Sequence, residues 1–227
     1  MIRSIAAAAL ALCTAGCAAT IYTEIEPRRP AKAPVVAERV ALLPVGADEG
    51  LEPNIAAIGD SLLAAAERAH PWVEFIPPQV TVDRLEQAGL AQRFDSLLIA
   101  YDQAGRFDGA VLRAVGQALG ADHLLDLRVG YERVRERTQG TLNPAVSYEA
   151  DRQNLYVTAG LWDLRAGDLA WEAVSTSTTR DAVYELPRSF NEVLAVAAAT
   201  LAQQIPLQPT PPPAPAPPAG AAPSGGP

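Results

Sequence analysis

The sequence has few of the residues that enzymes and metal proteins most often use. It contains two cysteines, two histidines and a single lysine, Lys32, among 227 residues. Acidic residues outnumber basic ones by 26 to 18, which gives a formal net charge of −8. Nucleic-acid binding depends on clustered lysine and arginine, so an acidic chain without a basic cluster is a poor partner for it. We therefore expect no nucleic-acid partner.

The scarcity of ligands also argues against a metal or a bound cofactor. His70 and His123 lack a second imidazole or thiolate at ligand spacing, whereas zinc requires three or four such groups. Gly105 and Gly109 lack the Lys-Ser/Thr pair of a phosphate-binding loop. Four aspartates near strands and turns would permit a weak calcium or paired-carboxylate site, although such aspartates are usually capping or solvated groups: Asp122, Asp126, Asp163 and Asp168. The sequence thus predicts no metal and no cofactor.

One short motif suggests hydrolysis. Gly59-Asp60-Ser61-Leu62 resembles the nucleophile block of GDSL-type esterases, in which a histidine near the carboxyl terminus activates the serine. No histidine follows His123, and Ser61 falls inside a predicted helix rather than on an exposed turn. A serine without a base is a weak nucleophile. We predict no catalytic residue, and a GDSL-like periplasmic hydrolase remains an alternative.

The amino terminus has the order of a secretory signal. Arg3 supplies a positive charge, Ile5 to Cys13 form an apolar run, and small residues follow up to Cys17. The run is about half of the ~20 residues that a membrane-spanning helix requires. We therefore interpret residues 1–16 as a signal peptide that is removed.

Thr14-Ala15-Gly16-Cys17 resembles the lipobox of bacterial lipoproteins. The resemblance implies that Cys17 receives a diacylglycerol, that the signal is cut before it, and that the new amine is acylated, commonly with palmitate. Ala18 and Ala19 replace the aspartate that marks inner-membrane retention in this family, which favours the outer membrane, facing the periplasm. Because Cys13 lies in the removed segment, no free thiol would remain. The alternative is an ordinary secretory signal with an incidental cysteine.

Composition divides the remaining chain into three parts. Residues 17–38 carry three prolines and read as a lipidated tether. Residues 39–205 contain the apolar periodicity of one folded domain. Residues 206–227 are almost entirely Pro, Ala, Gly, Ser and Thr, and predict a disordered tail of polyproline II character.

The predicted order of elements is β-α-β-α-α-β-β-β-α, in which the helical segments 94–104 and 107–119, on either side of Gly105, are taken together. Strands are expected at 40–45, 72–76, from 123, at 155–164 and at 169–178; helices are expected at 55–69, 80–88, 94–104, 107–119 and 190–204. Gly120 suits a helix carboxyl-terminal cap, and Gly167 suits a tight turn with positive φ. This order predicts an α/β or α+β fold with helices packed on a mixed sheet.

Two further patterns lie on the strands. Trp162, Trp171 and Tyr156 are on adjacent strands and predict a cross-strand aromatic cluster, buried in the core or exposed for recognition. The strand from 123 continues in polar form as a charged ladder in which acidic and basic residues are interspersed: Glu132, Arg133, Arg135, Glu136 and Arg137. This ladder is either a solvated strand face or a contact with a partner.

Residues 119–125 and 161–171 resemble a periplasmic α/β fold. It occurs in the amino-terminal domain of the translocation protein TolB, in curli-assembly lipoproteins and in lipoprotein activators of penicillin-binding proteins. The charged segment 132–154 contains Pro144 and does not suit a lipid-facing barrel strand, which argues against a pore. The resemblance implies a non-enzymatic binding, regulatory or assembly factor for another envelope protein, anchored in the outer membrane through Cys17. The alternatives are the hydrolase and a structural tether from membrane to cell wall.

Overall fold

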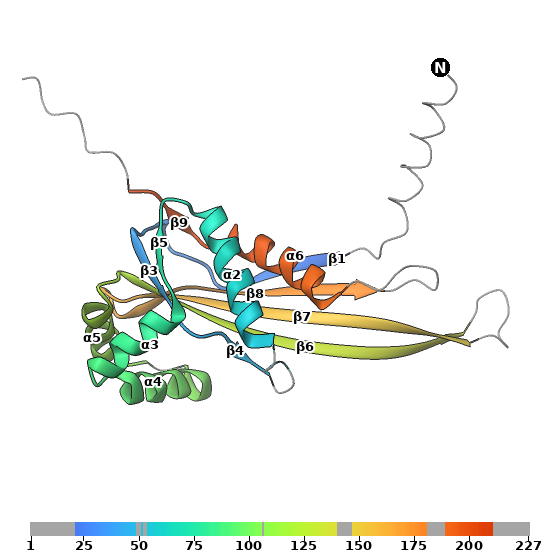
Figure 1. The fold of residues 1–227 in the computed structure, drawn as a ribbon, viewed down its shortest axis with the longest axis horizontal. Coiled ribbons are helices and arrows are strands. Elements are labelled where there is room, and N and C mark those ends of the chain that lie inside the picture. The colour runs from blue at the N-terminus through green and yellow to red at the C-terminus, as the bar shows by residue number, and fades with distance from the viewer. Residues whose placement is uncertain are drawn as a thin grey trace, which may run out of the picture.

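The structure is a computed structural model that describes residues 21–48, 51, 54–105, 107–139, 147–180 and 189–210. These residues form an α+β fold with five helices and a seven-stranded mixed sheet, as the sequence predicts (Figure 1). The strands are β1 (Ile21–Arg29), β2 (Val35–Val36), β3 (Arg39–Leu42), β4 (Gly46–Ala47), β5 (Glu74–Ile76), β6 (His123–Gln139), β7 (Ser147–Asp163), β8 (Asp168–Arg180) and β9 (Leu207–Gln208). The helices are α2 (Ile55–Ala69), α3 (Pro78–Gln87), α4 (Ala91–Ala104), α5 (Gly109–Leu119) and α6 (Phe190–Ala202). None of these helices is both long and apolar enough to span a membrane.

The main sheet combines a parallel and an antiparallel half. Its strand order is β1-β8-β7-β6-β3-β5, and β4 also pairs with β6. β3 runs parallel to β5 and to β6, whereas β1, β8, β7 and β6 form an antiparallel run. The parallel β3 and β5 are connected through α2, as a crossover requires.

Two apolar cores lie on opposite faces of the sheet. One core contains residues of α2 and α6, and the other contains residues of α3, α4 and α5. Alternation along β6 serves both faces: Leu125, Leu127 and Val129 belong to the first core, and Leu124 belongs to the second. The predicted apolar face of this strand is confirmed.

The proposed tether is wrong from Ile21 onward. Residues 21–29 form β1, an edge strand that pairs antiparallel with β8 from Ile21 opposite Thr179. Thr23 and Ser177 exchange a side-chain hydrogen bond of 2.8 Å across this pairing. The alternating Ile21, Thr23 and Ile25 carry the strand signal, and an edge strand tolerates the proline that follows.

The start of the predicted tail is also ordered. β9 pairs with β2 in a separate parallel two-stranded sheet, and the amide of Val35 donates to the carbonyl of Pro206 at 2.8 Å. Leu207 is only 5% exposed and packs in the first core. The folded unit therefore runs from Ile21 to Thr210 rather than from 39 to 205. Residues 1–20, with Cys17, and residues 211–227 lie outside the described residues.

Two glycine positions bear out the turn predictions. Gly120 caps α5 at φ 61°, and Gly167 lies in the β7–β8 turn at φ 72°. Both values are in the left-handed region that favours glycine. Between them, the two turns bring residues 122–123 next to residues 163–168 at one end of the sheet.

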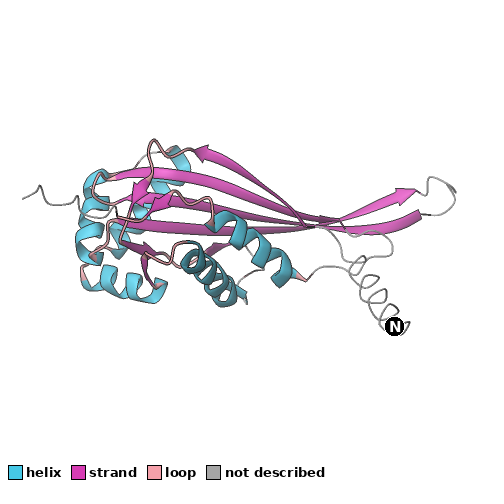
Figure 2. Ribbon diagram, turned by 90° about the horizontal axis from the view of Figure 1, so that it is seen from above, coloured by secondary structure: helices cyan, strands magenta, loops and turns pink. Residues whose placement is uncertain are grey.

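The opposite end of the sheet carries a long two-stranded ribbon. β6 and β7 pair without interruption from His123 opposite Asp163 to Gln139 opposite Ser147. β8 accompanies β7 only as far as Arg152, so no described strand flanks β6 and β7 beyond that point. Both ribbon views show this part projecting from the helices (Figures 1 and 2).

Candidate binding groove

A largely apolar groove with charged groups at its base lies between α3, α4 and the strands β3, β4 and β6. Its volume is about 480 Å³, within the ~300–1,000 Å³ of typical ligand sites. Apolar side chains from the β3 end and from both helices form most of its wall: Leu43, Leu85, Phe94, Leu98 and Ile99. Ile99 is 55% exposed, so an apolar surface is accessible at the mouth of the groove.

One arginine organises the charged base of the groove. Arg128 on β6 donates from Nη1 to Oδ2 of Asp102 on α4 at 2.7 Å. Its Nε and Nη2 donate to Oδ2 of Asp126 on the same strand face at 3.2 and 3.1 Å. Charge-assisted hydrogen bonds of this kind fix both helix and strand relative to each other.

Burial and neighbouring charges both shift the pKa values of Asp126 and Arg128. Burial raises the pKa of the Asp126 carboxyl, and Arg128 opposes this rise through charge and hydrogen bonding. Burial alone lowers the pKa of Arg128, but the carboxylates of Asp126 and Asp102 outweigh it and the pKa is raised. Arg128 therefore remains a cation, and its charge favours the ionised form of Asp126.

The rim of the groove is acidic. Glu86, Asp95 and Asp102 are exposed lining residues, and Arg128 is the one basic residue among those lining the described groove. An apolar wall beside several carboxylates suits an apolar side chain next to a cationic group. It does not suit an anionic ligand, because the nearest cation is already shared by two carboxylates.

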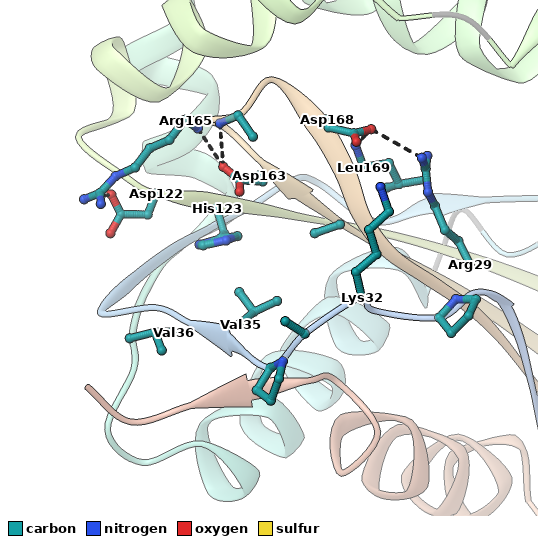
Figure 3. Close-up of a pocket in the computed structure, with 15 residues that line it drawn as sticks. Arg29, Lys32, Val35, Val36, Asp122, His123, Asp163, Arg165, Asp168 and Leu169 are labelled. Carbon is teal, nitrogen blue, oxygen red and sulfur yellow. Dashed lines mark hydrogen bonds and ion pairs between the residues drawn. The ribbon is translucent and has the colours of Figure 1, made fainter. Parts of the chain in front are cut away.

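A second, more polar pocket of about 430 Å³ lies at the end of the sheet where β6 begins (Figure 3). Its charged groups are largely paired with one another. Arg29 contacts Asp168 at 3.5 Å, and Arg165 contacts Asp122 at 2.5 Å. Each pair holds a turn or strand end in place, and the side chain of Lys32 also lines this pocket.

Three of the four predicted aspartates gather at this end of the sheet. Asp163 accepts the amides of Arg165 and Ala166 at 2.9 and 2.8 Å, which makes it a turn cap. Asp122 and Asp168 are paired with arginine, as stated above. Asp126 lies instead in the groove. The residues that the structure describes contain no group of three or more potential metal ligands.

The two histidines are buried apart from each other. Nε2 of His70 is 2.8 Å from the carbonyl oxygen of Ala202, which joins the end of α2 to α6. His123 lines the polar pocket, and its buried Nδ1 has no hydrogen-bond partner among the described residues. Burial lowers the pKa of His123, against the opposing charges of Asp163 and Asp122.

Ser61 is placed as a helical residue, not as a nucleophile. It lies in α2, and its hydroxyl donates to the carbonyl of Ala57, one turn earlier, at 2.9 Å. This is the common back-bonding of serine within a helix. The esterase-like motif is therefore a helical segment here, with no base hydrogen-bonded to its serine in the described chain.

The predicted aromatic cluster is wrong. Trp162 and Trp171 belong to different cores, on opposite faces of the sheet. Trp162 instead makes edge contacts with Tyr101 and Phe107, at centroid distances of 4.9 and 5.7 Å. Both tryptophans are buried, as the core interpretation predicted. A register shift between Leu161 and Trp162 accompanies this divergence.

Sequence reasoning missed the groove itself. Asp126 and Arg128 were visible as polar positions on an otherwise apolar strand, which was the available signal. Asp102 completes the set from a distant helix, and a contact across 26 residues leaves no periodic trace. The charged ladder from 132 lies on the ribbon, where side chains are described only up to Arg135 on β6.

No family model matches the sequence, and no curated protein matches it. Among solved structures the chain is similar to the PelC dodecamer from Paraburkholderia phytofirmans, at 16% identity over 82% of this chain and 100% of that one, with a TM-score of 0.44. It is also similar to lipoprotein GNA1162 from Neisseria meningitidis (15% identity, 74% and 96% covered, TM-score 0.35). A third similar structure is the LpoB C-terminal domain from Salmonella enterica (14% identity, 63% of this chain and 84% of that one covered, TM-score 0.33). These similarities assign no function and no functional residue to this chain.

Proposed function

We propose that this chain is a lipid-anchored outer-membrane protein that faces the periplasm and binds another envelope protein. Cys17 carries the lipid, and the protein acts as a regulatory or assembly factor without chemistry of its own. The partner presents an apolar side chain flanked by basic residues. The groove between α3, α4 and β6 receives it.

The observation that carries this proposal is the composition of the groove. Its wall is apolar and open at Ile99, and its rim carries Glu86, Asp95 and Asp102. Apolar anchors in pockets supply most of the affinity of protein interfaces, and surrounding charges select the partner and speed its approach. An acidic rim on an acidic chain favours a basic partner segment.

The proposed membrane anchoring is supported by residues 14–17 and by the positions of the two cysteines. Acylation of Cys17 would supply two or more chains, which is the number that stable membrane anchoring requires. Cleavage before Cys17 would remove Cys13, so the mature domain would contain no thiol exposed to an oxidising periplasm.

Site-specific photo-crosslinking tests the groove. A photoreactive residue at Ile99 is expected to give one discrete adduct in intact cells. A matched probe at Val196, an exposed apolar position on α6 across the sheet, is expected to give none. If the groove binds a basic segment, the adduct at Ile99 is expected to disappear when Glu86 and Asp95 are both changed to Lys. Equal adducts from both probes, or an adduct indifferent to this charge reversal, would refute the proposed partner chemistry.

A further inference from the structure

The first residue of β1 and the ribbon lie at the same end of the sheet. Ile21, the first residue of β1, is opposite Thr179 on β8, which is opposite Gln153 on β7 and Arg133 on β6. β1 therefore begins beside the point where the ribbon begins to project. In Figure 1 the start of β1 and the ribbon point the same way, away from α3, α4 and α5.

The reach of the anchor is shorter than the ribbon. Cys17 is four residues before Ile21, and a fully extended chain of that length covers at most about 14 Å. The ribbon continues for six residues beyond the register of Ile21, from Val134 to Gln139. At about 3.3 Å per residue this is roughly 20 Å. A lipid at Cys17 thus cannot place the membrane beyond the end of the ribbon.

We propose that the distal β6–β7 ribbon, residues 134–139 and 147–152, contacts the membrane surface and lies among the lipid headgroups. The inference rests on the proposed lipidation of Cys17. With so short a connection, the bilayer meets this end of the sheet first. The groove, at the helical end, then faces away from the membrane and toward a periplasmic partner.

The composition of the ribbon fits headgroups rather than hydrocarbon. Three basic residues are matched by three acidic ones across its two strands: Arg135, Arg137, Arg152, Glu136, Glu149 and Asp151. Charged side chains are costly in the bilayer core but are accommodated at its polar surface. Because the charges balance, the anchor and not electrostatic attraction brings the ribbon to the lipid. The contact should not require anionic lipid.

A two-stranded ribbon also benefits from such a surface. Isolated two-stranded hairpins are marginally stable in water, and no described strand flanks residues 135–139. A membrane surface against the ribbon would supply the neighbour that the described sheet does not give it there.

Fluorescence quenching in vesicles tests the inference. Once Cys17 is acylated, a Thr138→Cys substitution introduces the single reactive thiol for an environment-sensitive dye on the ribbon. Ser96→Cys, on the exposed face of α4, is the matched control. The purified lipidated proteins are reconstituted on the outside of phosphatidylcholine vesicles that contain headgroup spin-labelled lipid. Several-fold stronger quenching is expected at position 138 than at position 96.

A second variant separates the geometry of the anchor from any affinity of the ribbon itself. Insertion of about twelve Gly and Ser residues between Ala19 and Thr20 adds roughly 20 Å of reach. The proposal expects this variant to remain bound to vesicles and to lose most of the quenching at position 138. Undiminished quenching would mean that the ribbon binds lipid by itself, which overturns the anchor-imposed contact.

The two proposals fail differently in this experiment. Protein that floats with vesicles but shows no quenching at position 138 keeps the lipid anchor and overturns the ribbon contact. Protein that fails to float, or that carries no acyl chain by mass spectrometry, overturns the anchor at Cys17. Addition of phosphatidylglycerol is expected to leave the quenching ratio unchanged.

Discussion

Two guanidinium nitrogens of Arg128 on β6 donate to the same carboxylate oxygen of Asp126, two residues earlier, at 3.1 and 3.2 Å. The third contact of Arg128 is with Asp102 on α4, at 2.7 Å. The exposed fractions of the two acidic side chains differ, at 13% for Asp126 and 45% for Asp102. This difference predicts which partner of the arginine matters for stability.

Removal of the exposed partner should cost little. We expect Asp102→Asn to lower the free energy of unfolding by less than about 1 kcal/mol, the usual size of an exposed ion pair. Arg128→Met retains an unbranched stem but leaves Asp126 without its donor, and we expect it to cost about 1 to 3 kcal/mol. Urea unfolding of the two variants measures both values. Equal costs would show that Asp126 does not depend on Arg128.

Acid should destabilise the protein through His123. Its folded pKa lies below the value of 6.5 that applies to the unfolded chain, because burial disfavours the imidazolium. In the window below about pH 6.5 and down to the folded pKa, the unfolded state binds more protons, so stability falls as the pH falls. We expect the His123→Gln protein to lose less stability in this window. Urea midpoints at neutral and mildly acidic pH compare the two proteins. Parallel pH profiles would contradict this assignment.

The two buried tryptophans should be comparably important although they lie in different cores. Trp162 and Trp171 are 1% and 5% exposed. We expect an alanine substitution at either position to cost about 3 to 5 kcal/mol, as large-to-small changes in cores do. Trp72, at 43% exposure, is the control, and Trp72→Ala should cost much less. Thermal unfolding that is unchanged in Trp171→Ala would remove it from the core.

The anchor depends on one thiol. We expect Cys17→Ser to give a soluble or unprocessed protein, because both the acylation and the cleavage that the lipobox resemblance implies act at this cysteine. Fractionation of cells, with an antibody to the folded domain, measures the distribution. A processed Cys17→Ser protein that still sediments with outer membranes would assign the anchoring to another part of the chain.

Periodicity revealed most of the domain because the long elements are amphipathic. The alternation from Leu125 to Val129 and the helical spacing from Ile58 to Leu62 both match buried positions. β1 and β9 were missed for a different reason. Ile21 to Ile25 sits between the lipobox and a proline-rich stretch, and Leu207 begins the proline-rich tail, so composition outweighed the short apolar signal in each case. The groove needed Asp102 and Arg128 together, and only the packing of α4 on the sheet joins them.

The carboxyl-terminal boundary gives the last prediction, which a matched pair of truncations tests. A protein that ends at Thr210 retains β9, the Pro206 contact with Val35, and the hydrogen bond from Thr210 to Glu38 at 3.1 Å. We expect its melting temperature to match that of the full chain, because residues 211–227 have no apolar periodicity that would dock on a domain. A protein that ends at Ile205 loses β9 and exposes the core beneath Leu207.

We expect this shorter protein to lose about 1 to 3 kcal/mol, as burial of one leucine side chain and its strand contact would give. Differential scanning calorimetry of the two truncations, beside the full chain, measures the difference. If both truncations melt with the full chain, β9 is not part of the folded unit. If the Thr210 truncation is itself destabilised relative to the full chain, residues 211–227 dock on the domain. Stability that is retained on truncation at Thr210 and lost on truncation at Ile205 would place β9 in the folded domain. β9 would then belong to the domain although it lies, like β1, outside the region of strong sequence periodicity.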